Sequence, residues 1–239
     1  MPQTQGLQRD DDYDSSPLQK MLSSNQAWAE EHRKLNPTFF EQMAAGQSPH
    51  TLWIGCADSR VPESLITNSQ PGEIFVHRNI ANQVPLQDDN TLSVVEYAVN
   101  HLHVRHIIVV GHSNCGGAAA SLAAATSPEA SFCAHNGSSC LQTVPTLPPD
   151  NPINKWLQQL TKLAFSLGIS TAPKDEALSL LIEENVKAQV ENLSKLEVIQ
   201  DAWQNPEAQR KELWIHGWVY EIETGLLSDL NISRGPSAA

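Results

Sequence analysis

Three short apolar runs in the first half of the chain predict the strands of a buried sheet. They are TLWIGC (51–56), EIFVHRN (73–79) and HIIVVGH (106–112). Each run is partly β-branched or aromatic and ends in glycine or polar residues, which is typical of a strand covered on both faces. Residues 89–103 repeat apolar residues at helical spacing behind acidic residues that can cap a helix. Strand, helix and strand in this order form a crossover unit, so the sequence predicts an α/β fold with a central, mostly parallel sheet flanked by helices.

The N-terminal part of the chain predicts helices. Residues 1–16 are polar and acidic, and we expect a flexible arm there. Residues 17–46 carry apolar residues at helical spacing on both sides of Asn36-Pro37, where a proline interrupts the pattern. This pattern predicts two helices, which form a helical arm at the start of a single domain spanning residues 17–239.

The second half of the chain predicts two helices, an insertion and a final strand. Residues 116–126 (GGAAASLAAAT) predict the first helix, and residues 175–203 predict one long helix. Between them, residues 127–151 lose periodicity and collect proline, serine and asparagine, which predicts a loop insertion. The alternation in residues 212–230, on both sides of Glu-Thr-Gly, predicts a last strand and a turn.

The charge of the chain narrows the class of partner. Among its 239 residues, 27 are acidic and 15 are basic, which gives a formal net charge of −12. Nucleic acid and anionic membranes are bound through clustered lysine and arginine, so this balance argues against both and favours a small-molecule substrate. No apolar run approaches the roughly 20 residues that span a bilayer, and the first residues resemble neither a signal nor a transit peptide. We therefore expect a cytoplasmic protein.

Potential metal ligands close two of the predicted strands. Cys56 ends the first run, and His112 and Cys115 follow the third in the motif HSNC. The carboxyl ends of neighbouring parallel strands meet at one edge of a sheet, so these side chains can converge there. Two thiolates and one imidazole favour zinc, and three protein ligands leave a fourth position open for water, as in catalytic sites. Taken singly, Cys56 could be a core residue and His112 a hydrogen-bonded loop residue, but their joint position favours the metal site.

Asp58 and Arg60 follow the first candidate ligand at a spacing of two residues each. In an extended segment they project to the same side as Cys56. A bidentate ion pair with Arg60 would keep the Asp58 carboxylate off the metal and leave it free to orient metal-bound water. The alternative is an ordinary surface ion pair that contributes little.

Three motifs resemble those of the β-class carbonic anhydrases: CADSR (56–60), PGEIFVHRNIAN (71–82) and GHSNCGG (111–117). The resemblance covers nearly the whole folded part of the chain, from about residue 39 to residue 230. It implies that the two cysteines and the histidine bind one zinc ion per subunit and that Asp58 and Arg60 form a catalytic dyad. It also implies that zinc-bound hydroxide converts CO2 reversibly to bicarbonate and a proton.

The same resemblance assigns two further sets of residues. The substrate-binding residues at the entrance would be Gln47, Phe75 and Tyr97. In the subgroup of the family that bicarbonate inhibits, the anion binds behind the active strand to residues that match Trp53, Arg78 and Tyr220. Bicarbonate bound there would favour release of the aspartate from the arginine and its coordination to zinc, which closes the site. Family members assemble as homodimers or tetramers whose N-terminal helices wrap the partner subunit, and residues 17–46 would suit that role.

The chain also departs from the family pattern. The insertion at residues 127–151 is longer than the matching connection in compact members, and its Cys133 and Cys140 could form a disulfide, although a reducing cytoplasm favours free thiols. Two other functions stay open: hydrolysis of carbonyl sulfide or carbon disulfide on the same fold, and a non-catalytic zinc module that senses CO2 or bicarbonate. A structural site gains nothing from a restrained carboxylate, so Asp58 and Arg60 argue against the sensor.

Overall fold

The computed structural model of the chain describes residues 16–127, 142–204 and 213–236. The chain forms two compact units, Met1–Gln47 and Ser48–Ala239, and each is described by itself. The predicted flexible arm falls outside the described residues except for Ser16, which begins the first helix. Within the described parts, no helix combines the length and the apolar character that crossing a membrane requires.

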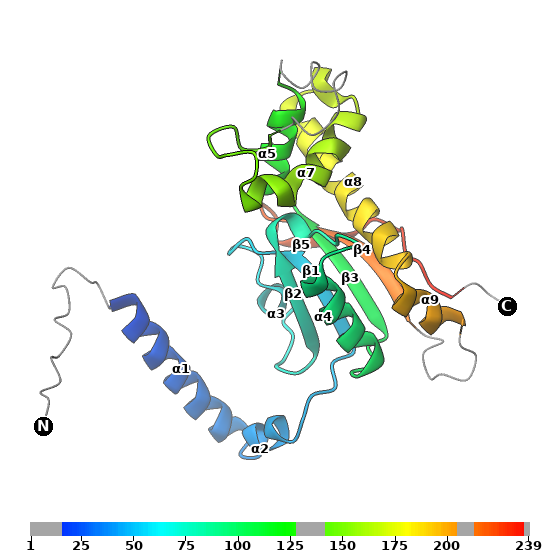
Figure 1. The fold of residues 1–239 in the computed structure, drawn as a ribbon. Coiled ribbons are helices and arrows are strands. Elements are labelled where there is room, and N and C mark those ends of the chain that lie inside the picture. Colours follow the sequence, from blue (N-terminus) through cyan, green and yellow to red (C-terminus); the bar gives the residue numbers. More distant parts are fainter. Residues whose placement is uncertain (1–15, 128–141, 205–212, 237–239) are drawn as a thin grey trace, which may run out of the picture. The chain divides into compact units, whose positions relative to one another are not determined.

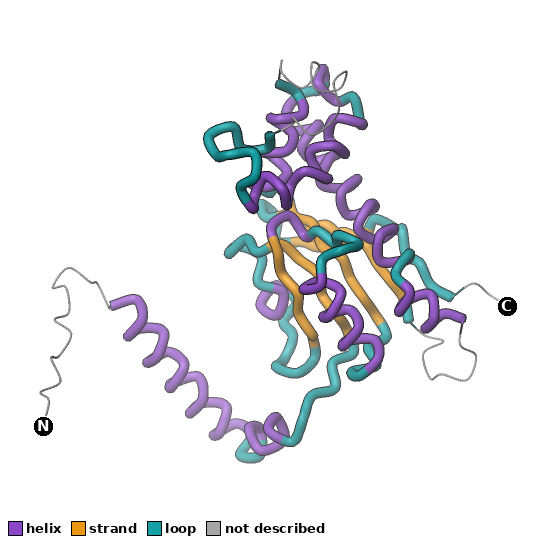
Figure 2. The backbone as a smooth tube through the Cα atoms, viewed as in Figure 1, coloured by secondary structure: helices purple, strands orange, loops and turns teal. Residues whose placement is uncertain are grey.

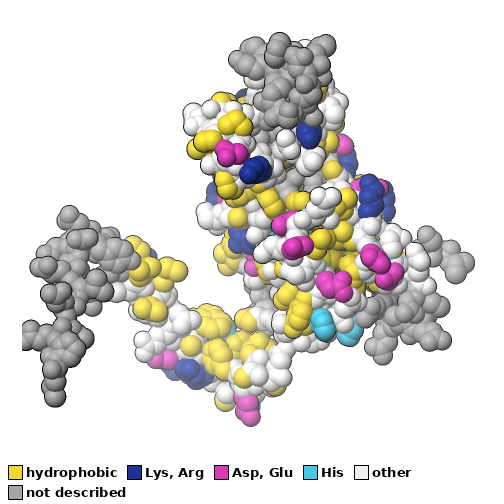
Figure 3. Space-filling model, viewed as in Figure 1, with side chains coloured by type: hydrophobic (Ala, Val, Ile, Leu, Met, Phe, Trp, Pro, Cys, Tyr) yellow, Lys and Arg dark blue, Asp and Glu magenta, His cyan; other side chains and the backbone are white. Residues whose placement is uncertain are grey.

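The N-terminal unit consists of two helices, as the sequence predicts (Figure 1). α1 covers Ser16–Leu35 and α2 covers Phe39–Ala44. They separate at Asn36-Pro37, because proline lacks the backbone N–H that a continuing helix needs. Trp28 on α1 packs edge-on against Phe40 on α2, with ring centroids 5.7 Å apart. None of the residues of either helix is buried, and apolar side chains lie on the surface of α1 (Figure 3).

The larger unit is built on a five-stranded sheet in the order β2-β1-β3-β4-β5. Its strands are β1 (Thr51–Cys56), β2 (Ile74–Asn79), β3 (His106–His112), β4 (Trp214–Glu221) and β5 (Leu226–Asp229). The first four strands are parallel, and β5 returns antiparallel to β4 through the predicted turn. Cys56 pairs with Asn79 of β2, and His112 pairs with Tyr220 of β4. The carboxyl ends of the parallel strands therefore meet at one edge, and the predicted fold is confirmed.

Helices pack around this sheet (Figures 1 and 2). They are α3 (Glu63–Ile66), α4 (Asp89–Asn100), α5 (Gly116–Ala125), α7 (Pro152–Ser166), α8 (Lys174–Ser194) and α9 (Glu197–Gln204). Trp53 of β1 belongs to an apolar cluster shared with α5 and α7, whereas Leu52 and Ile54 belong to a second cluster shared with α4 and α9. Because both faces are covered, the strand reads as a continuous apolar run.

The helix α7 was not predicted, and its start explains why. The prolines before it predict a loop, and residues 142–151 do form turns and bends. Pro152 then occupies the first turn of α7, where the missing N–H has no partner inside a helix anyway. Asn151 caps the helix by accepting a hydrogen bond from the amide of Ile153. The rest of the predicted insertion, including Cys133 and Cys140, lies outside the described residues.

The single long helix predicted at residues 175–203 is wrong, because the chain forms two helices, α8 and α9. The break falls at Lys195 and Leu196, whose amides close a turn onto the carbonyls of Asn192 and Leu193. This turn redirects the chain so that Ile199 of α9 becomes fully buried in the cluster shared with α4. Neither glycine nor proline marks the break, so the sequence pattern runs through it without a signal.

Candidate metal centre

Three buried side chains with metal-binding atoms converge at the carboxyl edge of the sheet. Cys56 ends β1, His112 ends β3, and Cys115 is the residue that precedes α5. One ligand atom from each residue lies within 4.8 Å of the other two, and the residues are 6%, 1% and 3% exposed, respectively. The structure therefore brings together the three residues that the sequence predicts as ligands.

The hydrogen bonding of His112 fits a metal ligand. Its Nδ1 lies 2.8 Å from the carbonyl oxygen of Ser113, which makes Nδ1 the protonated nitrogen and leaves a lone pair on Nε2. Nε2 is buried and has no hydrogen-bond partner among the described residues. A buried polar atom without a partner is costly, and a cation held between this nitrogen and the two sulfurs would satisfy it. The donor set and its hydrogen bonding thus fit a bound metal ion.

Hydrogen bonding between the two thiols separates their acidities. The bond with Cys115 lowers the pKa of Cys56 to about 4, although burial acts in the opposite direction. The same bond raises the pKa of Cys115 far above its usual range, and burial adds to the increase. A cation bound between the two sulfurs would hold both of them as thiolates, so metal binding would release protons.

Asp58 and Arg60, on the segment after β1, form a bidentate ion pair. Asp58 Oδ2 accepts a hydrogen bond from Arg60 Nη2 at 2.7 Å, and Oδ1 accepts one from Nε at 3.0 Å. These bonds hold the pKa of Asp58 well below its usual range, so the group is a carboxylate at neutral pH. Oδ2 also lies 3.9 Å from Nε2 of His112. A restrained carboxylate thus stands beside the three candidate ligands.

Arg78 on β2 holds the backbone of the segment that carries Cys56 and Asp58. Its Nε donates to the carbonyl of Cys56 at 2.9 Å, and its Nη2 donates to the carbonyl of Asp58. Its Nη1 lies 3.7 Å from Oε2 of Glu63, which is buried and makes no hydrogen bond in the described structure. Any anion that drew Arg78 away would therefore disturb the segment that carries Cys56 and Asp58.

Trp53 and Tyr220, the other residues of the predicted bicarbonate set, are buried in the same apolar cluster. Gly55 pairs with Arg78 across β1 and β2, and a Cβ atom at Gly55 would collide with Nε1 of Trp53. The indole of Trp53 therefore lies over Gly55, beside the strand position of Arg78. Tyr220 pairs with His112, and its carbonyl accepts a hydrogen bond from the amide of Ser113.

The predicted substrate-binding residues do not share the edge of the sheet that holds the cysteines. Phe75 and Tyr97 contact each other, with ring centroids 5.8 Å apart. Phe75 pairs with Leu52 of β1, four residues before Cys56, which is about 13 Å along the strand. Gln47 is the last residue of the N-terminal unit, so its place at the site remains a prediction.

Two backbone groups of the site could not be inferred from the sequence. The amide of Ala81 donates to Sγ of Cys56 at 3.4 Å, and the carbonyl of Asn114 accepts a hydrogen bond from Arg60 at 3.2 Å. Both residues are left-handed, with φ of 61° and 56°. Asparagine tolerates this conformation, so Asn114 offers a weak sequence signal, whereas an alanine at position 81 offers none.

Comparison with known proteins points to one family. Residues 51–227 match the carbonic anhydrase family. A carbonic anhydrase of Emericella nidulans is 38% identical over 217 residues, which cover 89% of this chain and 83% of that protein. A carbonic anhydrase of Saccharomyces cerevisiae is 32% identical, with 91% of this chain and 90% of that protein covered. A crystal structure from a study of two tetrameric β-carbonic anhydrases of Sordaria macrospora gives a TM-score of 0.76 at 36% identity, over 92% of this chain and 99% of that chain.

Proposed function

The chain belongs to the β-class carbonic anhydrases, and we propose that it hydrates CO2 reversibly to bicarbonate and a proton at a zinc ion held by Cys56, His112 and Cys115. The observation that carries this proposal is the buried Nε2 of His112, which lacks a hydrogen-bond partner among the described residues and lies within 4.8 Å of a sulfur from each cysteine. Thiolate and imidazole are ligands that suit zinc. A zinc ion in this set supplies Lewis-acid activation of a water molecule at its open fourth position.

Asp58 and Arg60 form the proposed catalytic dyad. Arg60 binds both carboxylate oxygens of Asp58, so the carboxylate does not occupy the open ligand position itself. Asp58 then accepts a hydrogen bond from the attacking water and holds its lone pair toward the carbon of CO2. The depressed pKa of Asp58 supports this role, because the group remains an acceptor throughout the neutral range.

Trp53, Arg78 and Tyr220 form the proposed bicarbonate site that inhibits the enzyme. Support comes from the hydrogen bonds of Arg78 to the carbonyls of Cys56 and Asp58. An anion bound to Arg78 competes with these carbonyls and loosens the segment that carries the dyad. Asp58, whose Oδ2 lies 3.9 Å from Nε2 of His112, would then be free to leave Arg60 and to hold the metal as a fourth protein ligand. Bicarbonate must bind this closed state more tightly than the open one to shift the population.

The proposed assembly is a homodimer or a tetramer. α1 is a helix of 20 residues with none buried, and Leu18, Met21 and Leu22 on it are exposed. Most of the stability of helices in proteins comes from packing of an apolar face, so packing of these side chains against a second subunit would stabilise α1. Phe75 supports the same proposal: it pairs with Leu52, four strand residues before Cys56 of its own chain, so Phe75 and its neighbour Tyr97 would line the entrance to a partner's site. The Sordaria macrospora relatives are described as tetrameric.

The experiment that tests the proposed reaction is a comparison of three substrates on one zinc-loaded sample. Stopped-flow assays with CO2, carbonyl sulfide and carbon disulfide separate the carbonic anhydrase from a hydrolase on the same fold. The proposal expects CO2 hydration to be by far the fastest reaction. A sample that contains zinc and turns over none of the three would instead support the non-catalytic sensor, in which the zinc site serves recognition alone.

A further inference from the structure

The amide of Ala81 donates a hydrogen bond to Cys56 Sγ at 3.4 Å, and it sits in an unusual turn. The turn Ile80–Asn82 follows β2, and both Ala81 and Asn82 adopt left-handed backbone conformations, with φ of 61° and 47°. Residues other than glycine enter this region at a conformational cost. Ala81 is fully buried, so it cannot be held there by solvent. Other groups of the protein must therefore fix this turn.

Trp156 on α7 holds the first of the two peptide groups that flank Ala81. Its Nε1 donates to the carbonyl of Ile80 at 2.8 Å. That carbonyl belongs to the same planar peptide as the amide of Ala81, which donates to Sγ of Cys56. Because the peptide is planar, a fixed carbonyl also fixes the direction of its N–H. The hydrogen bond from Trp156 further polarises the peptide and strengthens its N–H as a donor.

Asn185 on α8 holds the second peptide group. Its Nδ2 donates to the carbonyl of Ala81 at 3.0 Å, and its Oδ1 accepts hydrogen bonds from Gln83 at 2.7 Å and from Gln189 at 3.0 Å. Gln83 also donates to the same Ala81 carbonyl at 2.7 Å. All three amides are at least nine-tenths buried. An amide is the side chain that can donate and accept at once, so Asn185 joins the turn to α8 without leaving a polar atom unpaired.

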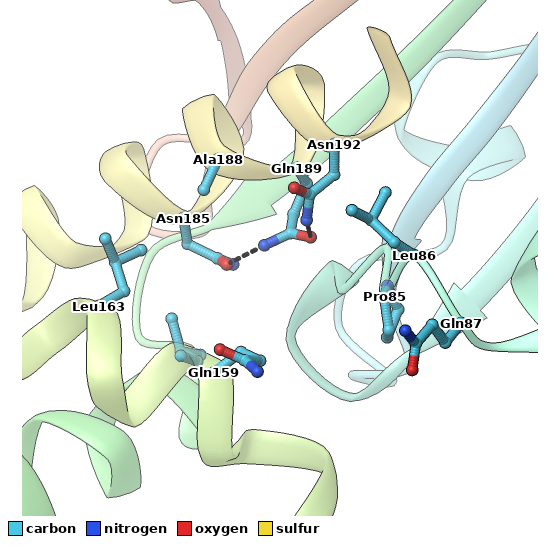
Figure 4. A pocket seen from close by; sticks show the side chains of 10 residues that line it. Pro85, Leu86, Gln87, Gln159, Leu163, Asn185, Ala188, Gln189 and Asn192 are labelled. Carbon is cyan, nitrogen blue, oxygen red and sulfur yellow. Dashed lines mark hydrogen bonds between the residues drawn. The ribbon is translucent and has the colours of Figure 1, made fainter. Parts of the chain in front are cut away.

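The network extends along one face of α8, as the close-up shows (Figure 4). Gln189 accepts hydrogen bonds from the amide of Val84 and from Asn192, which in turn donates to the carbonyl of Val84. The side chains of Asn185, Gln189 and Asn192 also line a cavity of about 530 Å³. Through Val84, Gln189 and Asn192 hold the segment that follows the turn. On the opposite side, a Cβ atom at Gly117 would come within 3.1 Å of Ala81 Cβ, so α5 packs closely against the turn.

We propose that Trp156 and Asn185 are positioning residues of the metal centre, which aim the amide of Ala81 at the sulfur of Cys56. The N–H···S bond stabilises the negative charge on the thiolate without occupying the lone pair that binds the metal. Without this hydrogen bond, the sulfur of Cys56 is held less firmly in its orientation. Its negative charge is also no longer stabilised by the amide. This inference rests on the proposed zinc site.

The test compares Trp156→Phe and Asn185→Leu with wild type by zinc affinity, measured against a chelator, and by the thiolate-to-cobalt charge-transfer band after cobalt substitution. The matched control is Trp203→Phe, which removes an equivalent indole hydrogen bond to the carbonyl of Leu213, at the opposite end of the sheet. Both test variants should bind zinc about tenfold more weakly and shift the band, since loss of such supporting bonds costs about 10- to 100-fold in metal affinity. The control should match wild type in both readouts.

The possible results separate the inference from the function on which it rests. Test variants that bind zinc within about twofold of wild type with an unshifted band overturn the positioning role, as does a control that weakens zinc binding equally. If Asn185→Leu does not fold, Trp156→Phe alone decides, because it shortens a partly buried ring and, unlike the leucine substitution, leaves no buried amide side chain unpaired. Wild-type protein that binds no zinc at all rejects the proposed metal site itself.

Discussion

The guanidinium of Arg60 and the carboxylate of Asp58 meet through two hydrogen bonds, Nη2 to Oδ2 at 2.7 Å and Nε to Oδ1 at 3.0 Å, although only one residue separates them in the chain. The arrangement places a carboxylate, bound at both oxygens, beside the three candidate metal ligands. A carboxylate that only stabilised the fold would not need both of its oxygens restrained at this position. Substitution of either residue of this pair therefore tests the proposed catalytic dyad.

The dyad predicts that Arg60→Ala loses catalysis but keeps zinc. Without the guanidinium, the Asp58 carboxylate is free to move toward the open ligand position, and misplaced catalytic groups cost about 100-fold in rate. Stopped-flow CO2 hydration and zinc content should be measured on the same preparation. Arg60→Lys keeps the positive charge but lacks the planar guanidinium that binds both carboxylate oxygens. Its CO2 hydration rate should therefore lie between those of wild type and Arg60→Ala. A near wild-type rate in Arg60→Ala would mean that Asp58 and Arg60 form an ordinary surface ion pair without a catalytic role.

The ligand assignment predicts that Cys56→Ala and His112→Ala lose stoichiometric zinc and CO2 hydration together. An open site with three protein ligands cannot compensate for the loss of one. The control is Cys133→Ser combined with Cys140→Ser, which removes two thiols from the insertion. This double variant should keep its zinc and most of its activity in reducing buffer. A zinc-free double variant would show that the metal lies elsewhere.

The cap of α4 predicts a pH-dependent contribution to stability. Hydrogen bonds from Thr91 hold the pKa of Asp88 below its ordinary value. A carboxylate with a lowered folded-state pKa stabilises the fold fully above its unfolded-state value of about 3.9, and the contribution is lost as the pH falls through the folded-state pKa. Asp88→Ala should therefore lower the free energy of unfolding by about 1 kcal/mol at pH 7 and by progressively less below pH 4.

Urea unfolding at fixed protein concentration measures this difference. Asp88→Asn serves as the control, because asparagine caps a helix nearly as well as aspartate but does not titrate. The difference in unfolding free energy between wild type and Asp88→Asn should shrink at acid pH, as it does for Asp88→Ala. At pH 7 this difference should be smaller for Asp88→Asn than for Asp88→Ala. A difference between wild type and Asp88→Ala that stays constant with pH would contradict the linkage.

The bicarbonate proposal predicts an inhibition that Trp53→Val abolishes. In wild type, hydration should fall at acid pH and fall further with added bicarbonate, beyond simple product competition. Trp53 is 2% exposed, so its replacement leaves a cavity, and Tyr220→Phe offers a milder variant that removes only a hydroxyl group. Rates should be measured against pH at several bicarbonate concentrations. If all three proteins show the same simple competition, the regulatory site is absent although the carbonic anhydrase activity stands.

The sequence predicts that the three candidate ligands converge, because two of them end neighbouring strands. The apolar runs place Cys56 and His112 at the carboxyl ends of β1 and β3, and parallel pairing brings those ends together. The backbone contributions were not predictable: Ala81 donates to the sulfur only because α7 and α8 hold its turn in a left-handed conformation. The break at Lys195 has the same origin, since burial of Ile199 decides it and local propensity does not.

Zinc stoichiometry connects the three candidate ligands Cys56, His112 and Cys115 to the hydration of CO2. Zinc should be titrated into metal-free protein, with CO2 hydration followed by stopped flow at each addition. The rate should rise in proportion to added zinc and level off at one zinc ion per subunit. A fully loaded protein that hydrates CO2 no faster than the metal-free protein would contradict the proposed function.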